Sequence, residues 1–309
     1  MGNKDISMAN SFSKMGPGKI GVVTVTYNSA DVLPEFLDSI AVQTYSDFVV
    51  YVIDNASKDD TIAICKQRSD LPLVLVPNET NIGVAEGNNQ GIRKALEAGC
   101  EYVLLLNNDT VFDGNLIAQL QSGLVEHQCA MITPKILYHD NPQQIWAAGG
   151  YFQRWLGYRV KHYGSDQRDS GRFEEVRTIT YAPTCCVLVR SSVFDQIGLM
   201  DPAYFVYSDD TDFMYRAGNA GLEIKYLPGA KVFHKVSSLT GGAASPFTMR
   251  YCTRNRIYFI RKHLPAIPAA FWAATYYGYL LSRYLMRMDK KSAWTLKRAA
   301  ILEGLKMPL

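Results

Sequence analysis

Residues 103–111, "VLLLNNDTV", join four aliphatic side chains directly to two amides and a carboxylate. The aliphatic part predicts a buried strand, and Asn107, Asn108 and Asp109 follow where that strand ends. Asn and Asp favour turns because their side chains bond to their own backbone, so a turn alone would explain them. The alternative is that the end of the strand carries a functional site, and the rest of the chain has to decide.

Apolar segments alternate with segments of helical spacing between residue 19 and this stretch. The predicted strands are residues 19–28, 48–55, 71–78 and 101–109, and the predicted helices are residues 30–43, 59–69 and 84–99. Strands that are apolar throughout and alternate with helices are typical of a parallel sheet covered on both faces. The sequence therefore predicts an α/β fold with a mostly parallel sheet.

Polar residues follow three of these four strands: Tyr27 and Asn28, Asp54 and Asn55, and the group that ends in Asp109. In open α/β sheets, ligands bind beyond the carboxyl ends of the strands. Asp109 is therefore expected where such a sheet carries its chemistry, which favours a site over a simple turn.

A second acidic group lies in "SDDTDF", residues 208–213, at the expected start of a helix. Capping and the helix dipole explain one acid there. They do not explain three in four positions, because crowded carboxylates raise each other's pKa. A carboxylate with a pKa near neutrality suits a general base. His234 ends the strand expected after this helix, and a lone histidine is more often structural than a ligand.

Charge is unevenly distributed along the 309 residues, whose net charge is +3. Residues 250–309 carry twelve Lys or Arg side chains against two acidic ones, so residues 1–249 have a balance of −7. Two regions with different partners are implied. No recognition motif accompanies the basic region, so nucleic acid is not expected as a partner. The six cysteines show no CxxC pair, which favours reduced thiols in a cytoplasm.

The basic region contains residues 264–282, nineteen residues without charge, which meet the nominal length of a membrane span. Two prolines at the start, three tyrosines in the second half and the basic residues that follow favour a helix lying in or on an anionic membrane surface. A helix packed on the protein's own core is the other alternative. Residues 1–18 are polar, end in Gly-Pro-Gly and are expected to form a flexible leader.

Residues 19–245 resemble glycosyltransferase family 2, the inverting nucleotide-sugar transferases with the GT-A fold. The ordered segments that carry the resemblance are "VTVTYN", "VIDNASKDDT", "NETNIGVAEGNNQGI", "LLLNNDT", "AAGGYF", residues 193–234 and the "SSLTGG" after them. The resemblance implies residues 19–248 as the catalytic domain, with a nucleotide-binding half (19–110) and an acceptor half (111–248). Residues 249–309 would form a helical appendage.

The resemblance implies a nucleotide site at the ends of the first strands. Tyr27 and Asp54 would hold the base, with the carboxylate accepting from the ring imide N–H. Asn81, Gly83 and Asn88 would line the nucleoside pocket, with glycine allowing a close backbone approach.

The resemblance also implies a metal site beside the nucleotide. Asn107 would lie near the ribose, with Asn108 beside it, and Asp109 would ligate a divalent cation that bridges the two phosphates. His234 would be a second ligand of this cation. Mn²⁺ or Mg²⁺ would neutralise the diphosphate leaving group, and the histidine favours Mn²⁺.

Asp210 matches the catalytic base of the family, and Asp209 would position the acceptor or tune Asp210. Trp146, Gly149 and Gly150 would line the sugar site, although Trp146 also suits an ordinary core. Two departures concern the acids: Asn107 stands where many members have Asp, and Ser208–Asp209 stand where a Glu often precedes the base. A third is "PTCC", residues 183–186, which lacks a glycine frequent in the family.

The favoured activity is transfer of rhamnose from a dTDP- or UDP-sugar to a glycan or lipid-linked saccharide, with galactosyl, galactofuranosyl and glucosyl transfer as alternatives. A cytoplasmic enzyme, peripheral on the inner face of the membrane and open to homo-oligomer formation, is expected. Two other classes of protein are the alternatives. A nucleotidyltransferase or NAD-dependent enzyme lacks support because "GVAEGNNQG" is not the G-x-G-x-x-G fingerprint. A non-catalytic sugar-nucleotide-binding protein would not need Asp54, Asp109, Asp210 and His234 together.

Overall fold

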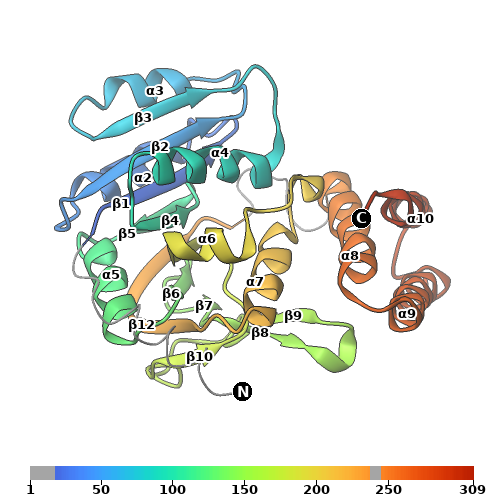
Figure 1. Ribbon diagram of the computed structural model, residues 1–309. Coiled ribbons are helices and arrows are strands. Elements are labelled where there is room, and N and C mark those ends of the chain that lie inside the picture. Colours follow the sequence, from blue (N-terminus) through green and yellow to red (C-terminus); the bar gives the residue numbers. More distant parts are fainter. Residues whose placement is uncertain (1–17, 237–244) are drawn as a thin grey trace.

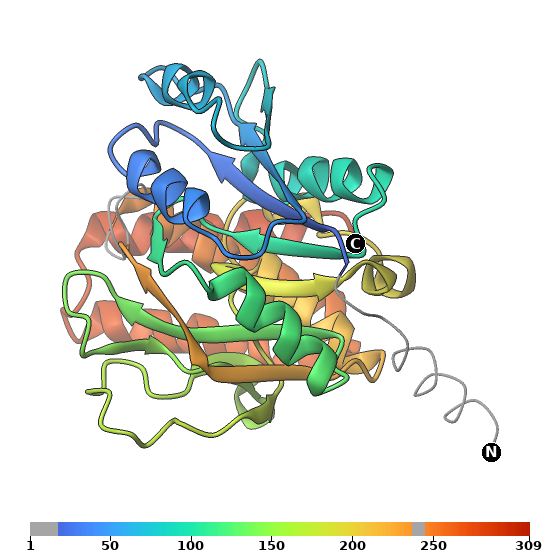
Figure 2. The same cartoon turned by 90° about the vertical axis from the view of Figure 1, so that its left-hand side faces the viewer.

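The computed structural model describes residues 18–236 and 245–309 (Figure 1). These residues form a central sheet with helices on both faces and three further helices at one side (Figures 1 and 2). The predicted α/β fold with a mostly parallel sheet and a C-terminal helical appendage is confirmed. The expected leader, apart from Gly18, and the "SSLTGG" segment lie outside the described residues.

The N-terminal half contains the four strands that the sequence predicts. They are β1 (Ile20–Thr26), β2 (Phe48–Asp54), β3 (Leu73–Pro77) and β4 (Tyr102–Leu106), connected by α2 (Leu33–Ala41), α3 (Thr61–Gln67) and α4 (Gly83–Glu97). All of them pair in parallel, in the order β3-β2-β1-β4. Because the strands are parallel, their carboxyl ends lie along one edge of the sheet.

The second half extends the sheet beyond β4. Its strands are β5 (Thr110–Phe112), β6 (Met131–Tyr138), β7 (Ile145–Ala147), β8 (Gly150–Gln153), β9 (Arg159–His162), β10 (Arg177–Ile179), β11 (Cys186–Arg190) and β12 (Ile224–His234). Its helices are α5 (Leu116–Glu126), α6 (Ser191–Ile197), α7 (Asp209–Asn219) and the short 3-10 turns η1 (Arg154–Leu156) and η2 (Pro202–Tyr204). The antiparallel β11 separates β4 from β6, and β12 runs parallel to β6. Therefore β12 ends at the same edge as β1, β2 and β4.

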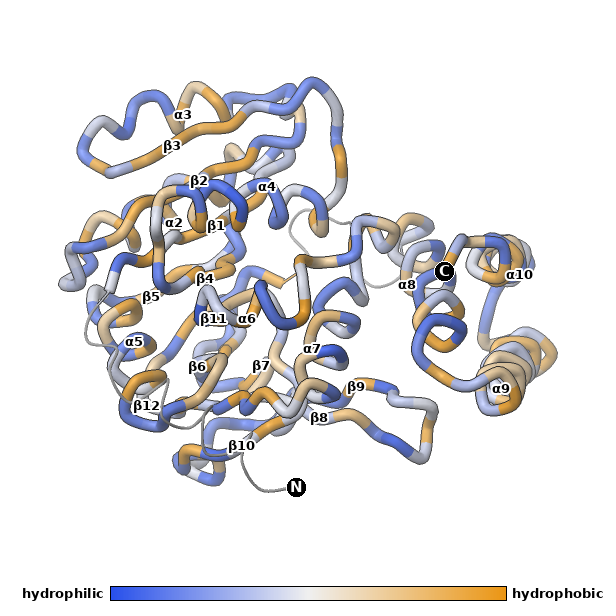
Figure 3. Tube along the Cα trace, viewed as in Figure 1, coloured by the Kyte–Doolittle hydropathy of each residue, from blue (hydrophilic) through white to orange (hydrophobic). Residues whose placement is uncertain are grey.

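Small residues let helix α4 lie close to the sheet. A Cβ atom at Gly91 would come within 2.3 Å of Val23, and one at Gly87 within 2.9 Å of Val25. On the opposite face, Phe36 of α2 packs edge-on against Phe112 at 6.0 Å between ring centroids. Both faces of the central strands are thereby buried, which explains their uninterrupted apolar sequences (Figure 3).

The C-terminal region consists of α8 (Pro246–His263), α9 (Ala266–Leu285) and α10 (Lys291–Lys306). Helix α8 packs on the second half of the sheet domain, where Tyr258 and Phe259 form a buried cluster with Tyr204 of η2. The expected domain boundary at residue 248 therefore falls in the first turn of α8.

Helix α9 contains most of the uncharged segment 264–282. Within the two described ranges, no helix has the length and apolar character needed to span a bilayer. One face of α9 packs through Leu280 on a small core that includes Trp294 of α10. On its other face, Ile267 is 85% and Phe271 60% exposed. The alternative that this helix packs on the protein's own core thus holds for only one face of α9.

Candidate functional site

The carboxyl ends of β1 and β2 adjoin because Thr26 pairs with Asp54. Asp54 is fully buried, and its carboxylate accepts hydrogen bonds from the Thr26 hydroxyl at 2.9 Å and from the backbone N–H of Ser57 at 3.0 Å. The next residue of β1's end, Tyr27, is 46% exposed. A fixed carboxylate and an exposed aromatic ring therefore adjoin at the edge where the resemblance predicts the base of the nucleotide.

The first residues of α4 contact a distant part of the same chain, at Phe205. Asn81 accepts a hydrogen bond from the Gly83 N–H at 3.0 Å. Gly83 has φ +86°, and a Cβ there would lie 2.5 Å from the carbonyl oxygen of Phe205. This carbonyl also accepts from the N–H of Val84 at 2.6 Å. The close approach that the sequence predicts at Gly83 is thus made to Phe205, and α4 is capped by a residue 122 positions away.

Three predicted nucleotide-site amides have their own contacts in the fold. Asn88 is buried and its Nδ2 donates to the sulfur of Met200 at 3.6 Å, so it faces the interior. The N–H of Asn107 donates to the Cys185 carbonyl at 2.9 Å. Asn108 donates through Nδ2 to the backbone of β1, while its buried Oδ1 has no hydrogen-bond partner among the described residues. Of the three, Asn108 keeps a free acceptor near the strand ends.

Asp109 and His234 meet at the same edge although they are far apart in sequence. His234, the last residue of β12, pairs with Thr110 of β5, which places its ring beside the preceding Asp109. The carboxylate Oδ1 lies 3.2 Å from the imidazole Nε2, and both residues are 8% exposed. Burial lowers the pKa of His234, but the adjacent Cys185 and Asp109 outweigh it and hold the pKa well above its usual value.

The chemistry of this pair fits a divalent cation. A carboxylate oxygen and an imidazole nitrogen are suitable donors for Mn²⁺, and both point to one place. In the described part of the chain, no group of three or more His, Cys, Asp or Glu side chains is placed to hold a metal. The protein therefore offers two ligands, and further ligands would have to come from a bound molecule or water.

The acids of "SDDTDF" lie at the start of α7. Asp210 accepts hydrogen bonds from the Tyr181 hydroxyl at 2.5 Å and from the Thr211 N–H at 2.6 Å. Burial raises the pKa of Asp210. Burial and the neighbouring Asp210 raise the pKa of Asp209 to about 7, and its buried Oδ2 has no partner within the described ranges. The pair can therefore hold and release a proton near neutral pH.

The third acid of this segment has a different environment. Asp212 is fully buried and contacts His263 at 2.6 Å, Lys262 at 2.7 Å and Arg216 at 2.8 Å. Burial opposes its ionisation, but the hydrogen bonds from His263 and Lys262 and the charges of Lys262 and Arg216 outweigh burial and hold the pKa of Asp212 well below its usual value. Asp212 therefore anchors α7 to α8 and is not available as a base.

The substitution Asp209→Asn is expected to stabilise the protein more at pH 8 than at pH 5, by about 2–3 kcal/mol. The folded-state pKa of about 7 lies above that of the unfolded chain, so the folded protein binds this proton more tightly. The stability that the wild-type protein gains from this tighter proton binding is fully present below the ordinary pKa of an aspartate, and it is lost as pH rises toward 7. Urea unfolding at both pH values measures the effect. The exposed Asp195→Asn is the control, and equal stabilisation at both pH values would contradict the raised pKa.

A row of rings connects the Asp109–His234 pair to Asp210. Trp146 lies 4.9 Å from His234 and 4.9 Å from His162, measured between ring centroids. His162 lies 5.5 Å from Tyr181, which donates to Asp210. Sequence reasoning identified Trp146 but missed His162 and Tyr181.

The ring of His162, which sequence reasoning did not identify, lacks a hydrogen bond among the described residues. Its buried Nδ1 has no hydrogen-bond partner in the part of the chain that is described, and burial lowers its pKa to about 4. His162 is therefore neutral near pH 7. It lies at the end of β9, in a segment without clear periodicity, so only its alternation with Arg159 and Lys161 could have indicated a strand.

The two glycines expected at the sugar site have packing reasons in the fold. Gly149 has φ +72°, and a Cβ there would lie 2.9 Å from Ile179. A Cβ at Gly150 would lie 2.8 Å from the Tyr181 ring. Their lack of side chains lets β8 lie against the residue that holds Asp210, so they shape the site by close packing.

Helix α8 fixes the loop that leads into the acid pair. Asn255 is fully buried and donates through Nδ2 to the carbonyls of Tyr204 at 3.0 Å, Val206 at 2.7 Å and Tyr207 at 2.8 Å. Tyr207 and Ser208 both have positive φ, at 62° and 63°, which is strained for residues with side chains. The hydrogen bonds from α8 hold this backbone in place directly before Asp209.

Replacing Asn255 with Ala is expected to lower the free energy of unfolding by about 2–4 kcal/mol, because the carbonyls of Tyr204, Val206 and Tyr207 lose this donor. Chemical denaturation of the purified full chain measures the change. Asn141→Ala, at an exposed amide with a single local partner, is the matched control and should change stability by less than about 0.5 kcal/mol. A similarly small change for Asn255→Ala would contradict the stabilising role of the three hydrogen bonds from Asn255, which we call the Asn255 clamp.

Comparison with known families adds an independent finding. Residues 21–198 match the model of the family described as glycosyl transferase family 2. The matched part contains the four parallel strands and the Asp109 edge, and it ends before the acid pair and His234.

Relatives of known name and a solved structure point the same way. The chain is 29% identical over 238 residues to N-acetylglucosaminyl-diphospho-decaprenol L-rhamnosyltransferase of Mycobacterium tuberculosis, covering 71% of this chain and 77% of the relative. It is 25% identical over 260 residues to a dTDP-rhamnosyl transferase of Shigella flexneri, covering 80% and 82%. A mannosyltransferase from Pyrobaculum calidifontis, solved with GDP-Man and Mn²⁺, is similar in fold, with a TM-score of 0.57, 15% identity and coverage of 96% and 91%.

Proposed function

The chain belongs to glycosyl transferase family 2 and is a glycosyltransferase, and on this premise we propose that it transfers rhamnose from a dTDP- or UDP-linked donor to a hydroxyl group of a lipid-linked saccharide or other glycan. Two relatives support the choice of sugar, since both are named as transferring rhamnose. The Shigella relative is named for a dTDP donor, and the mycobacterial relative for an acceptor on a decaprenol diphosphate.

One observation supports this proposal most. The edge of the sheet carries a carboxylate–imidazole pair at 3.2 Å, and the Trp146–His162–Tyr181 row joins it to a second pair of acids at the start of α7. A transferase needs two such places, one for the leaving diphosphate and one for the attacking hydroxyl. Aromatic faces between them suit a sugar ring.

The donor half of the site would use groups that the fold already fixes. Tyr27 and Asp54 would contact the base, and the free Oδ1 of Asn108 is available to a donor hydroxyl. Asp109 and His234 would hold a Mn²⁺ or Mg²⁺ ion, which when bound supplies positive charge to the departing diphosphate. The two protein ligands leave positions for phosphate oxygens.

The acceptor half would carry out the proton transfer. Asp210, oriented by Tyr181 and the Thr211 N–H, would take the proton from the acceptor hydroxyl as its oxygen attacks the anomeric carbon. The bond between that carbon and the diphosphate oxygen breaks in the same step, so the anomeric configuration inverts. Asp209, with a pKa near 7, would share the negative charge of the pair with Asp210.

The cellular location that we propose for the enzyme depends on the proposed lipid-linked acceptor. We propose that the enzyme works as a peripheral protein on the cytoplasmic face of the membrane, because a lipid-linked acceptor is confined there and residues 250–309 are strongly basic. Galactosyl, galactofuranosyl and glucosyl transfer stay the alternative activities on the same site.

The direct test is incubation of the protein with Mn²⁺, a lipid-linked N-acetylglucosamine acceptor and, separately, dTDP-rhamnose, UDP-galactose, UDP-galactofuranose or UDP-glucose. Mass spectrometry identifies the product, and NMR gives its anomeric configuration. A rhamnosylated product with a configuration opposite to that of the donor is expected. Transfer from another donor would change the assigned sugar, and retention of configuration would overturn the mechanism. Absence of both transfer and donor hydrolysis with every donor would overturn the proposed function.

A further inference from the structure

The outer face of α9 is apolar and exposed. Ile267, Phe271 and Leu285 are 85%, 60% and 69% exposed. With 3.6 residues per turn, their spacing places all three on one side of the helix. Charged residues are absent from residues 264–282, and α9 is mostly hydrophobic in Figure 3. Soluble monomers rarely expose an uninterrupted apolar helix face without a function for it.

A basic turn, residues 286–290, follows the apolar face of α9. Arg287 and Lys290 are exposed, and so is Lys291 at the start of α10. The acid of the turn, Asp289, is held by Arg283 at 3.0 Å and Lys297 at 2.8 Å. No ion pair within the described residues engages Arg287, Lys290 or Lys291, so the turn carries an unneutralised positive charge.

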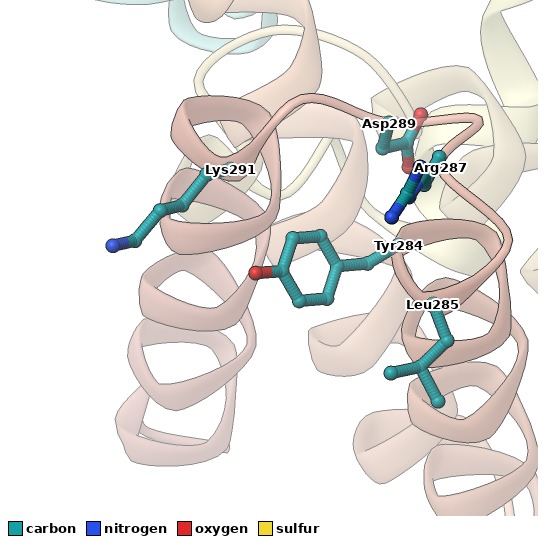
Figure 4. A pocket seen from close by; sticks show the side chains of 5 residues that line it. All are labelled: Tyr284, Leu285, Arg287, Asp289 and Lys291. Atoms are coloured by element: carbon teal, nitrogen blue, oxygen red, sulfur yellow. The ribbon is translucent and has the colours of Figure 1, made fainter.

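Apolar and basic side chains meet in one depression at this turn. The depression measures about 370 Å³ and is lined by Tyr284, Leu285, Arg287, Asp289 and Lys291 (Figure 4). Tyr284 lies between the two helices and stacks on Trp294 at 5.5 Å, whereas Lys291 points away from the helices. Met286 and Met288, 63% and 58% exposed, adjoin it.

The turn lies on the same side of the molecule as the site. In Figure 2, the connection between α9 and α10 is on the left, where the arrowheads of β1 and β12 also point. This is the side of the carboxyl ends and therefore of Asp109 and His234. An acceptor held by a surface in contact with the turn would be presented to the correct edge of the sheet.

We infer that the outer face of α9 and residues 285–291 form one docking surface for an anionic lipid bilayer, which we call the basic hairpin surface. The apolar face of α9 enters the headgroup region, and Arg287, Lys290 and Lys291 contact lipid phosphates. The purpose of this docking, delivery of a lipid-linked acceptor, rests on the proposed function. The contact itself rests on the apolar face and its basic border.

Charge favours a bilayer over a second copy of the chain as the occupant. Residues 250–309 have a balance of +10, and a two-fold dimer places equivalent patches against each other. Such a dimer would bring two basic turns together without acids to neutralise them. Lipid phosphates, in contrast, complement each basic residue, at a scale of about 1 kcal/mol per Lys or Arg.

The test is sedimentation of the full chain with vesicles of phosphatidylcholine alone or of phosphatidylcholine mixed with the anionic lipid phosphatidylglycerol. We expect binding to the anionic vesicles that falls as salt rises, and little binding to the neutral ones. Combining Arg287→Glu with Lys291→Glu should reduce the binding constant at least about tenfold. Combining Phe271→Ser with Leu285→Ser should reduce it by a similar factor.

A matched control is available on the sheet domain, away from α9 and α10. Lys66→Glu combined with Lys231→Glu makes the same change in net charge at two exposed lysines, and it should leave vesicle binding within about twofold. Equal loss in this control, or equal binding to neutral and anionic vesicles, would overturn the basic hairpin surface. A dimer in solution that the Phe271→Ser and Leu285→Ser variant converts to a monomer would also overturn it, in favour of self-association.

The two proposals fail separately in this design. Nucleotide release from the donor in the absence of membrane reports on the catalytic site, which the hairpin variants leave intact. Lost vesicle binding with unchanged nucleotide release supports docking by the hairpin. If donor hydrolysis is absent while vesicle binding follows the expected pattern, the proposed function is wrong and the basic hairpin surface stands.

Discussion

Asp210→Asn is expected to lower kcat for sugar transfer by about 10²–10⁴-fold while nucleotide affinity changes little. The amide keeps the size of the side chain, its oxygen can still accept from the Thr211 N–H, and its NH2 group can donate to the Tyr181 hydroxyl oxygen. It cannot take a proton from the acceptor, so the loss falls on the chemical step. Steady-state kinetics with the identified donor and acceptor, together with calorimetric nucleotide binding, separate the two effects.

The neighbouring acids provide the controls for this experiment. Asp195→Asn, at an exposed position on α6, should retain full activity. Tyr181→Phe removes the hydroxyl that orients Asp210 and should cause a smaller loss than Asp210→Asn. If Asp209→Asn is inactive while Asp210→Asn retains more than about a tenth of the activity, the two acids have the opposite roles.

Asp109→Ala is expected to weaken Mn²⁺-dependent nucleotide binding by about 100-fold, because the cation loses one of two protein ligands and binding of a metal-bridged diphosphate depends on it. Binding of UDP and dTDP, each with and without Mn²⁺, to wild type and variant measures this without any turnover. Removal of the metal with a chelator should bring the wild-type affinity close to that of the variant.

His234→Ala tests the other half of the pair. It should weaken Mn²⁺-dependent binding in the same direction, whereas Asp195→Ala should have no effect. If nucleotide binding ignores both the metal and Asp109, residues 107–110 serve only as a turn. The carboxylate–imidazole pair at 3.2 Å would then be a structural contact.

The N-terminal half of the fold was predictable because its signals are local. The four strands are apolar throughout, the helices have clear spacing, and polar residues appear where three of the strands end. Parallel pairing then places Thr26 beside Asp54, so the edge could be anticipated. The nearness of Asp109 and His234 was implied only by family resemblance, since the register of β12 on β5 is not visible in either segment alone.

The remaining features depend on contacts between distant parts of the chain. His162 and Tyr181 come from a segment without periodicity, and only the fold of β8 and β9 beside β10 brings them to the site. The glycine at position 83 was recognised as requiring a close approach, but its partner, Phe205, could not be named. For α9, the absence of charge was visible in the sequence, whereas the division into a packed and an exposed face required the positions of α8 and α10.

The clamp by Asn255 bears on how such enzymes can exchange parts during evolution. The two strained residues before the acid pair, Tyr207 and Ser208, lie in a loop held by a helix that the family match, ending at residue 198, does not include. A recombination that swapped everything after β12 would separate the acids from the side chains that hold them. Viable hybrids must therefore inherit α8 together with the acid pair, and also α10, which Arg250 and Arg261 bind to α8, so the exposed face of α9 is the part that can diversify toward new membranes or acceptors.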